Sequence, residues 1–478
     1  MKLSVIGCGY LGAVHAAAMA SIGHDVVGID VDERKIAALS AGEAPFFEPG
    51  LPELLTQGVA AGNLRFTTDM SAAQGAQVHF VGVGTPQQKD SHAADLTYVN
   101  AAIDALIPHL NPGDIVAGKS TVPVGTAAAL AERVAPTGAT LVWNPEFLRE
   151  GWAVEDTIDP DRLVVGVPGA RTVSATQIVG GLSDMHEDVS SRLARSTNAG
   201  NYSTGSASAA LPAEGERAAD ILREVYHPAV AKGTPFIVTD LATAELVKVA
   251  ANAFLATKIS FINAMAEIAE ATGADVTQLA DAIGHDARIG RRFLGAGIGF
   301  GGGCLPKDIR AFAARAEELG RGESVSFLRE VDAINLRRRE RAVQLVVDAF
   351  DGQVVGKKVT VLGAAFKPHS DDIRDSPALD AAVRLRGLGA DVTVTDPQAI
   401  ENARRQHPQL AYVDDRDDAL RGADAVIVVT EWDEYRRDLS PAHASSLVHG
   451  KIIVDGRNCL DAAAWRAEGW AYYGMGRP

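Results

Sequence analysis

The sequence contains little cysteine and no long uninterrupted run of apolar residues. Its 478 residues include only Cys8, Cys304 and Cys459, which are too few for a disulfide framework and lack the spacing of a metal site. No apolar stretch approaches the roughly 20 residues that are needed to cross a bilayer. We therefore expect a cytoplasmic protein with reduced thiols, without a metal centre or a membrane partner.

Positive charge is also scarce. Lys and Arg total 45 against 61 Asp and Glu, so the formal net charge is −16. A surface of this sign repels nucleic acids and anionic lipids on average, and it remains compatible with a small anionic ligand held by a few local cations. Because hydrophobic residues make up 47% of the chain, it has globular composition. At about 150 residues per domain, the length predicts about three domains.

The first 160 residues alternate short apolar runs with helical patterns, which is typical of a parallel sheet flanked by helices. We expect strands at 3–6, 26–30, 78–83, 115–117 and 141–143. This pattern predicts a Rossmann-like, doubly wound α/β domain. In such a sheet the carboxyl ends of the strands form the ligand crevice.

Two segments interrupt the α/β pattern. Residues 172–218 are rich in Ser, Ala and Gly, which favours a mobile surface insertion. From Thr239 the chain is strongly helical as far as Gly273, and about 32 residues make a rod of roughly 48 Å. Further helices are expected at 275–283, 306–319 and 324–349. The basic run 337–341 in the last of these favours a solvated helix face.

The last third returns to α/β patterning. Strands are expected at 358–362, 392–396, 425–430 and 452–455, with a helix from about Pro377. The stretch 422–430 resembles 75–83, which indicates two similar halves. We therefore expect domains at 1–238, 239–350 and 351–478. The long helix and a helical central domain would join the two Rossmann-like domains, with a ligand cleft between them.

A glycine-rich turn follows the first predicted strand and opens a helix, with the sequence Gly7-Cys8-Gly9-Tyr10-Leu11-Gly12. Gly7 permits the tight turn, Gly9 lets a pyrophosphate approach the backbone, and Gly12 lets the helix pack closely. Asp30 follows Gly12 by 18 residues and suits ribose hydroxyls, which favours NAD over NADP. Lys35 tempers that preference, and FAD remains an alternative because it uses the same cradle.

The segment 299–308, with the sequence GFGGGCLPKD, carries the most informative cysteine. Its glycines allow a close ligand approach, and Pro306 suits the first turn of a helix. Cys304 is therefore expected at a helix N-terminus beside Lys307. Both features would lower the pKa of its thiol, as a nucleophile requires. The alternative is a small buried hydrophobic residue, which is our interpretation of Cys459.

On the long helix, Lys248 and Asn252 are four residues apart and share one face. The surrounding residues are mostly apolar, so we expect a largely buried helix in which both polar side chains need partners. A developing alkoxide on a substrate would be a fitting partner. The alternative is a surface ion pair between Lys248 and Glu245.

More polar residues fall where predicted strands end. Residues 119–121 (KST) follow the fourth strand, and 144–150 (NPEFLRE) follow the fifth. Glu146 offers a general base, and Glu150 offers a polar contact to a cofactor. In the last third, Phe366-Lys367 and Arg457 place cations at strand ends, where they would suit further phosphates. These clusters converge on one crevice.

These residues belong to motifs that resemble the UDP-glucose/GDP-mannose dehydrogenase family. Besides the glycine turn, the motifs are KSTVPVGT (119–126), NPEFLREG (144–151), TAELVKVAANAFLATKISFIN (243–263), FLGAGIGFGGGCLPKD (293–308), FKPHSDDIRDSP (366–377) and DGRN (455–458). The resemblance covers nearly the whole chain apart from 172–218. It implies an NAD-dependent, four-electron oxidation of a nucleotide sugar, from the 6-hydroxyl to a carboxylate.

The resemblance also implies roles for single residues. Cys304 would capture the aldehyde as a thiohemiacetal that is then oxidised to a thioester. Lys248 and Asn252 would stabilise the oxyanion, with Asp308 assisting through a water. Glu146, near Thr121, would be the base for thioester hydrolysis.

Binding residues follow in the same way. The positions that match NAD contacts are Gly7, Gly9, Tyr10, Leu11, Gly12, Asp30, Lys35, Thr85, Thr121, Glu150, Lys307 and Arg374. Those that match substrate contacts are Glu146, Phe147, Leu148, Arg149, Glu150, Lys248, Asn252, Phe293, Leu294, Gly295, Gly299, Phe300, Gly301, Phe366, Lys367 and Arg457. Arg288 matches a residue supplied by a neighbouring subunit, which implies a homodimer or a higher homo-oligomer.

Two departures and several alternatives stay open. Gly303 stands where the family commonly has Ser, and the insertion at 172–218 is longer than usual. The motifs resemble the branch that acts on UDP-glucose more closely than those acting on GDP-mannose or a UDP-N-acetylhexosamine. A two-electron hydroxyacid dehydrogenase shares the Lys and Asn pattern but does not need Cys304. A dinucleotide-sensing regulator is the non-enzymatic alternative.

Overall fold

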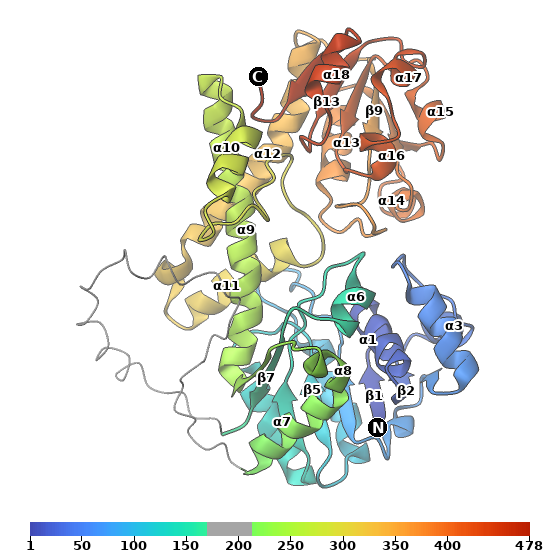
Figure 1. The fold of residues 1–478 in the computed structure, drawn as a ribbon, viewed down its shortest axis with the longest axis vertical. Helices are drawn as coiled ribbons and strands as arrows, with labels where there is room; N and C mark the ends of the chain where they lie inside the picture. The colour runs from blue at the N-terminus through green and yellow to red at the C-terminus, as the bar shows by residue number, and fades with distance from the viewer. Residues whose placement is uncertain (170–212) are drawn as a thin grey trace, which may run out of the picture.

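The computed structural model describes residues 1–169 and 213–478, and these form two sheets joined by a long helix (Figure 1). Most of the predicted insertion lies outside the described residues. Its predicted end at 218 is wrong, because helix α7 (Ala213–Val225) already begins at Ala213. This helix buries Ala218, Leu222 and Val225, so 213–218 belong to the first α/β unit.

The first sheet has eight strands in the order β3-β2-β1-β4-β5-β6-β7-β8. Neighbouring strands are parallel up to β6, whereas β7 pairs antiparallel with β6 and parallel with β8. The predicted α/β fold is confirmed, with a mixed rather than a wholly parallel sheet. The strands are β1 (Lys2–Ile6), β2 (Asp25–Ile29), β3 (Leu64–Thr67), β4 (Val78–Val81), β5 (Ile115–Gly118), β6 (Thr140–Trp143), β7 (Leu163–Val167) and β8 (Phe236–Asp240).

Helices cover both faces of this sheet. One buried cluster includes Leu3, Val5 and Met19, and a second includes Ile6 and Ile103. Since neighbouring residues of β1 belong to different clusters, side chains on both faces of the strand are buried, as expected for a sheet between two helical layers. The helices are α1 (Tyr10–Ser21), α2 (Glu33–Ser40), α3 (Leu51–Ala61), α4 (Thr97–Leu106), α5 (Thr126–Val134), α6 (Ala153–Ile158) and α8 (His227–Ala231).

The long helix α9 (Leu241–Thr272) bridges the two sheets (Figure 1). The Asp240 carboxylate caps its start by accepting the Thr243 N–H at 2.8 Å, and Gly273 in the left-handed conformation ends it. It packs against α10 (Val276–Gly284), α11 (Leu305–Glu318) and α12 (Phe327–Ala349).

The apolar character of α9 exceeds the expectation from the sequence. Among the described residues, α9 alone is long and apolar enough to cross a membrane by length and composition. The expectation of a largely buried helix holds for one face, because Phe254 and Ile268 are 67% and 59% exposed.

The prediction of a solvated basic face on α12 holds for Arg337 and Arg341, whose side chains are partly exposed, and is wrong for the two arginines between them. Arg338 and Arg339 are buried, and Arg338 pairs with Glu270 of α9 at 3.1 Å. Arg339 pairs with Asp375 at 2.7 Å and donates to the Phe300 carbonyl at 3.1 Å. Both guanidinium groups therefore join α12 to neighbouring segments.

The second sheet contains six parallel strands in the order β11-β10-β9-β12-β13-β14. As β4 lies beside β1, so β12 lies beside β9, which agrees with the similarity between 75–83 and 422–430. The strands are β9 (Lys358–Leu362), β10 (Asp391–Thr395), β11 (Ala411–Tyr412), β12 (Ala425–Val428), β13 (Ile452–Asp455) and β14 (Ala471–Gly474). The helices are α13 (Pro377–Gly387), α14 (Ile400–Gln406), α15 (Arg416–Leu420), α16 (Asp433–Arg436), α17 (Pro441–Ser445) and α18 (Ala462–Ala467).

Candidate active site

The glycine turn between β1 and α1 has the geometry of a phosphate cradle. Gly7 has φ +87°, and a Cβ at Gly12 would lie 1.8 Å from the Gly7 carbonyl oxygen. No atom lies within 4 Å of a Cβ built on Gly9, so the backbone there is open to a ligand. The N-terminus of α1 begins at Tyr10, directly after this turn, and offers free N–H groups.

Asp30 joins this turn to the end of β2. Its carboxylate accepts the Cys8 N–H at 2.8 Å and the Asp32 N–H at 3.0 Å, and it pairs with Lys35 at 2.9 Å. The acidic group therefore lies beside the cradle, at the position where a ribose would follow a pyrophosphate. The residues present fit a dinucleotide.

Two candidate polar residues of α9 are buried on one face, as the sequence predicts. The Lys248 ammonium lies 3.0 Å from Glu146 Oε1, and the Asn252 side-chain amide donates to Asp308 Oδ2 at 2.7 Å. Burial lowers the pKa of Lys248, but the charges of Glu146 and Asp308 outweigh it, so the pKa is raised. Lys248 is therefore a protonated cation beside the candidate nucleophile.

Cys304 is the N-cap residue of α11, as predicted, and its side chain is accessible to solvent. Protein groups nevertheless surround the sulfur. The resulting desolvation, followed by the charge of Glu146, raises the pKa of the thiol to about 12, against a smaller opposing effect of Lys248. The predicted lowering of this pKa is wrong, and the free enzyme holds a thiol rather than a thiolate.

Lys307 does not act as the sequence predicts. Its ammonium lies 2.9 Å from Asp308 Oδ1 and 3.4 Å from the Thr85 hydroxyl, and the largest effects on the pKa of Cys304 come from other groups. The Thr85 hydroxyl in turn donates to the Thr121 carbonyl at 2.8 Å. Lys307 therefore connects α11 to the strand ends of the first sheet.

The glycine-rich loop before Cys304 passes between α12 and the second α/β unit. Gly299 has φ +100°, and a Cβ there would lie 2.4 Å from Asn335 Oδ1. The Asn335 side chain accepts the Phe300 N–H at 2.7 Å and donates to the Phe300 carbonyl at 2.9 Å. A Cβ at Gly301 would lie 2.3 Å from the Asp375 carbonyl oxygen. These close approaches explain the glycines physically.

Arg457 braces the same loop from the second sheet. Its guanidinium donates to the carbonyls of Val429 at 2.7 Å, Gly299 at 2.8 Å and Phe366 at 2.9 Å. The side chain therefore holds three loops together at the strand ends. The neighbouring Lys367 is half-buried, and desolvation lowers its pKa against the raising effect of Glu150.

Glu150 and Arg374 link the first α/β unit to the second. The Arg374 guanidinium lies 3.0 Å from Glu150 Oε1 and 2.7 Å from Asp372 Oδ2. Burial and the charge of Asp372 raise the pKa of Glu150 to about 7, against the lowering effect of Arg374. A Cβ at Gly303 would lie 2.2 Å from the Arg374 guanidinium carbon, so the missing side chain leaves room for Arg374.

The remaining candidates lie farther apart. The Phe147 ring contacts Lys248, Leu148 donates its N–H to Glu146 at 2.8 Å, and Arg149 pairs with Asp156. Leu294 is buried, whereas Phe293 is exposed. Arg288 is exposed and pairs with Asp286 at 2.6 Å, away from the catalytic candidates of its own chain.

Comparisons with known proteins agree with this arrangement. Three models of the UDP-glucose/GDP-mannose dehydrogenase family match the chain: the NAD binding domain at 1–179, the central domain at 242–337 and the UDP binding domain at 360–462. A UDP-glucose 6-dehydrogenase of Rhizobium meliloti (strain 1021) is 38% identical over 100% of both chains. One of Bacillus subtilis (strain 168) is 38% identical over 100% of this chain and 93% of its own.

The chain belongs to the UDP-glucose/GDP-mannose dehydrogenase family. Its cofactor is NAD, and it is an NAD-dependent nucleotide-sugar dehydrogenase. A solved UDP-glucose dehydrogenase of Pyrobaculum islandicum is 36% identical, with a TM-score of 0.81 over 100% of this chain and 98% of that one. A UDP-D-ManNAc dehydrogenase of Pyrococcus horikoshii, at 24% identity and TM-score 0.78 over 100% and 99% of the chains, shows the fold alone.

The family domains divide the site in the way that the geometry suggests. The glycine cradle, Asp30 and Glu146 lie in the NAD binding domain. Cys304 and Lys248 lie in the central domain, while Arg457 lies in the UDP binding domain. The catalytic candidates therefore meet where all three family domains converge.

Sequence analysis missed several buried polar residues of this family member. Glu245 does not pair with Lys248, because its carboxylate accepts the N–H groups of Gly125 at 2.7 Å and Ala127 at 2.6 Å, at the start of α5. Burial raises the pKa of Glu245 to about 7. Asn144 begins the motif NPEFLREG, so the sequence could have marked it as a residue of the site. Tyr226 belongs to none of the motifs, so the sequence offered no indication of its role.

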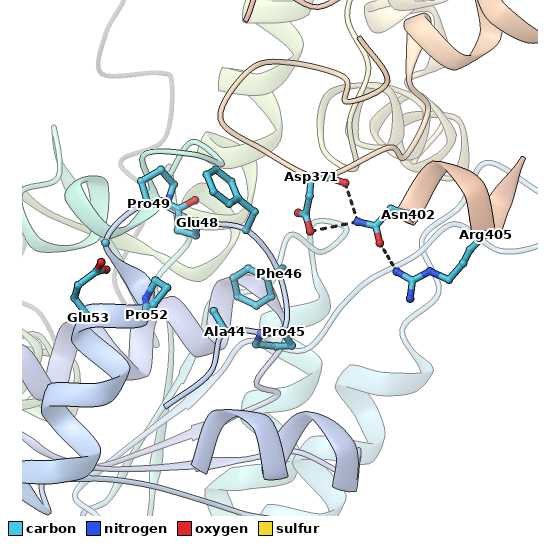
Figure 2. Close-up of a pocket in the computed structure, with 12 residues that line it drawn as sticks. Ala44, Pro45, Phe46, Glu48, Pro49, Pro52, Glu53, Asp371, Asn402 and Arg405 are labelled. Carbon is cyan, nitrogen blue, oxygen red and sulfur yellow. Dashed lines mark hydrogen bonds between the residues drawn. The ribbon is translucent and has the colours of Figure 1, made fainter. Parts of the chain in front are cut away.

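A separate cleft of about 570 Å³ lies where the loop before α3 meets the second α/β unit (Figure 2). The Asn402 amide donates to the Asp371 carboxylate at 3.2 Å, and Arg405 donates to Asn402. The Glu48 carboxylate on the opposite wall is buried and accepts the N–H groups of Gly151 and Ala153. No candidate catalytic residue lines this cleft.

Proposed function

We propose that this enzyme oxidises the 6-hydroxyl of UDP-glucose to a carboxylate, which yields UDP-glucuronate and reduces two NAD. The observation that carries the proposal is the convergence of an accessible thiol, Cys304, with the Lys248–Glu146 pair and the Asn252–Asp308 pair. Relatives that are 38% identical over the full chain are named UDP-glucose 6-dehydrogenases.

The first oxidation converts the alcohol to an aldehyde. The glycine cradle and Asp30 would hold NAD, which would supply the hydride acceptor for each of the two oxidations. Lys248 and Asn252 stabilise the negative charge that develops on the sugar oxygen. The hydroxyl proton leaves through a water to the Asp308 carboxylate, which accepts the Asn252 amide at 2.7 Å and passes the proton on to solvent.

The covalent steps account for the thiol. Cys304 Sγ bonds to the aldehyde carbon, and the thiol proton ends on the former carbonyl oxygen, which gives a thiohemiacetal. Loss of a hydride to a second NAD, and of the hydroxyl proton through the same water to Asp308, would then give a thioester. Water attacks the thioester carbon, Glu146 takes its proton, the C–S bond breaks, and the sulfur is reprotonated. The covalent adduct retains the aldehyde while the spent cofactor is exchanged.

We propose that the binding residues keep the roles that the family resemblance implies. Asp30 would receive the ribose of NAD, with Thr121 and Arg374 as further NAD contacts. The loop 293–301 and Lys367 would hold the nucleotide sugar. Arg457 fits this site as the brace of the loop, since three carbonyls already occupy its guanidinium.

The test is the number of NADH formed per sugar. Purified enzyme supplied with UDP-glucose and NAD should form two NADH for each sugar oxidised. Cys304→Ser should stall steady turnover and still bind the nucleotide sugar. One NADH with accumulating aldehyde, or turnover by Cys304→Ser at the wild-type rate, would reject the covalent scheme.

A second candidate is the same chemistry on GDP-mannose or a UDP-N-acetylhexosamine. The matching family models cover dehydrogenases of both UDP-glucose and GDP-mannose, which supports this alternative. A panel of nucleotide sugars, each scored for NADH stoichiometry, discriminates the substrates. We expect UDP-glucose to give the highest kcat/KM.

We further propose a homodimer formed through α9, and domains at 1–238, 239–350 and 351–478. Phe254, Phe261 and Ile268 recur every seven residues on the exposed side of α9. Lys258, on the same helix, donates to the Ile289 carbonyl at 3.0 Å, which holds the exposed Arg288 segment beside this side. A partner on α9 would therefore come within reach of Arg288.

A further inference from the structure

Lys119 is a buried lysine that the proposed reaction does not use. It follows the end of β5, at the crevice edge of the first sheet, and only 6% of the side chain is exposed. Long ammonium side chains rarely lie this deep without a paired carboxylate. Within residues 1–169 and 213–478, no carboxylate oxygen lies within 4.0 Å of its ammonium nitrogen.

Neutral groups hold the Lys119 ammonium instead. It donates to Asn144 Oδ1 at 3.1 Å and to the Tyr226 hydroxyl oxygen at 3.3 Å. The rings of Phe80 and Tyr226 lie 5.6 and 5.8 Å from the nitrogen, at cation–π distances. The Tyr226 hydroxyl also donates to Asn144 Oδ1 at 2.7 Å. Asn144 therefore receives two donors on one oxygen.

This cluster leads directly to the candidate base. The Asn144 amide donates to the Val164 carbonyl at 2.9 Å, so the side chain that precedes Glu146 by two residues is fixed at both ends. Glu146 is itself held by Lys248 on one oxygen and by the Leu148 N–H on the other. Lys119 thus holds Asn144, two residues before Glu146, and the two charges act on each other.

Electrostatics supports this arrangement. Four groups that face Lys119 from other elements are Glu146, Lys248 of α9, His15 of α1 and Tyr226. Burial lowers the pKa of Lys119 to about 8, the charge of Glu146 raises it, and that of Lys248 lowers it further. The pKa of His15 is lowered by burial and then by Lys119.

We infer that Lys119 is a positioning residue for Glu146: its ammonium favours the ionised carboxylate from the interior, while Asn144 fixes the turn that carries that carboxylate. The inference rests on the proposed function, in which Glu146 is the base. Because Lys119 acts on Glu146, Lys248 is free to turn toward the substrate oxygen and stabilise the charge that develops there. A buried cation without a carboxylate partner has a desolvation cost, which a purely structural role does not explain.

The first experiment measures, without substrate, how the charge of Glu146 affects the titration of Lys119. In enzyme labelled with [13Cε]lysine, the resonance absent from Lys119→Met should titrate near pH 8. Glu146→Gln should lower the midpoint by on the order of one pH unit, because the anion that favours the ammonium is lost. An unchanged midpoint in Glu146→Gln would overturn the inference, whatever the enzyme's substrate.

The second experiment measures turnover of UDP-glucose against pH. Lys119→Met removes the charge at similar volume, and Tyr226→Phe removes the hydroxyl from the same cluster while keeping the ring. In Lys119→Met the acid limb of kcat should move to higher pH by on the order of one unit, with a smaller change in KM. In Tyr226→Phe the limb should stay in place.

The two arms separate the possible failures. If the acid limb of kcat shifted equally in Lys119→Met and Tyr226→Phe, Lys119 would only hold Asn144 in place, and the inference would be overturned. Absence of NADH from UDP-glucose in the wild type would refute the proposed function, while the resonance of Lys119 would still decide its coupling to Glu146. Lys119→Met is expected to fold, since it replaces a buried charge with an apolar side chain.

Discussion

The sulfur of Cys304 lies among charges of both signs. Desolvation and the charges of Glu146, Asp308 and Glu150 favour the neutral thiol, while Lys248 favours the thiolate. Desolvation and the carboxylates outweigh Lys248, so the free enzyme keeps its thiol protonated. A protonated thiol resists adventitious oxidants, which attack thiolates. Attack on an aldehyde then requires the proton to move as the C–S bond forms.

This balance predicts how Cys304 reacts with iodoacetamide. Since the pKa of the thiol is about 12, the alkylation rate should keep rising tenfold per pH unit through pH 9, without a plateau. Glu146→Gln should speed alkylation by removing a charge that raises the pKa, and Lys248→Met should slow it. The measurement is peptide mass spectrometry of Cys304 against time and pH. A plateau near pH 7 would contradict the account.

Gly303 controls the position of Arg374. In Gly303→Ala, a Cβ 2.2 Å from the guanidinium carbon must displace that flexible side chain from Glu150. We expect the KM for NAD to rise several-fold, with little loss of stability, because the displaced group is the end of a long side chain. Gly387→Ala on α13 is the matched control, since no atom lies within 4 Å of its Cβ. An unchanged KM for NAD would show that Arg374 does not depend on Gly303.

Sequence analysis identified individual residues best where a motif ties chemistry to spacing. Gly7, Gly12 and Cys304 occupy the expected turn and helix start. The protonation state of Cys304 was not predictable, because it depends on Glu146, which lies more than 150 residues away in the chain. The family resemblance supplied the candidate set, while the structure supplied the charges around each member.

At the scale of elements, the glycine-rich loop depends on its anchors. Asn335 on α12 is fully buried and hydrogen-bonds both the N–H and the carbonyl of Phe300, and Arg339 also donates to that carbonyl. The loop carries Cys304 at its end, so its position sets that of the thiol. Its conformation is therefore determined by α12 as much as by its own glycines.

Asn335→Leu should uncouple this loop. The variant leaves the Phe300 N–H and carbonyl without the Asn335 side chain, so the free energy of unfolding should fall by on the order of 2 kcal/mol. The KM for UDP-glucose should rise more than the KM for NAD, because the loop 293–301 belongs to the proposed sugar site. Urea denaturation and steady-state kinetics measure the two effects. Equal changes in both KM values would argue against this role of the loop.

Sequence analysis missed the buried inner strand β7 and four strands at the edges of the sheets. β3, β8, β11 and β14 are edge strands, and β11 contains only two residues. Such strands bury little and carry weak apolar patterns. The reversed direction of β7 depends on the path of the chain before it, which residue types do not encode. Arg338 was assigned to solvent because charge patterns do not reveal a buried partner such as Glu270.

At the scale of the whole molecule, α9 is both the bridge between the sheets and the carrier of Lys248 and Asn252 (Figure 1). Its inward side holds catalytic candidates, and its outward side carries exposed aromatic and aliphatic residues. An association through the outward side would therefore stiffen the helix that positions the reaction.

Phe261→Glu tests this association. A charge in the middle of the exposed row should weaken the proposed dimer at least tenfold, because burying it without a partner is unfavourable. Light scattering coupled to size exclusion gives the mass of each species. Val355→Glu, at a position that is 77% exposed near the second sheet, is the control and should keep the wild-type mass. A wild-type species with the mass of one chain would refute the dimer.

The meeting of three chain regions at Cys304 is the central claim, and trapping the adduct tests it most directly. Glu146→Gln lacks the proposed base for hydrolysis, so incubation with UDP-glucose and NAD should build up a covalent sugar-nucleotide adduct. Peptide mass spectrometry should locate it on Cys304, at up to one per active site. Formation of NADH with Cys304 unmodified, or an adduct on Cys8 or Cys459 instead, would contradict the account.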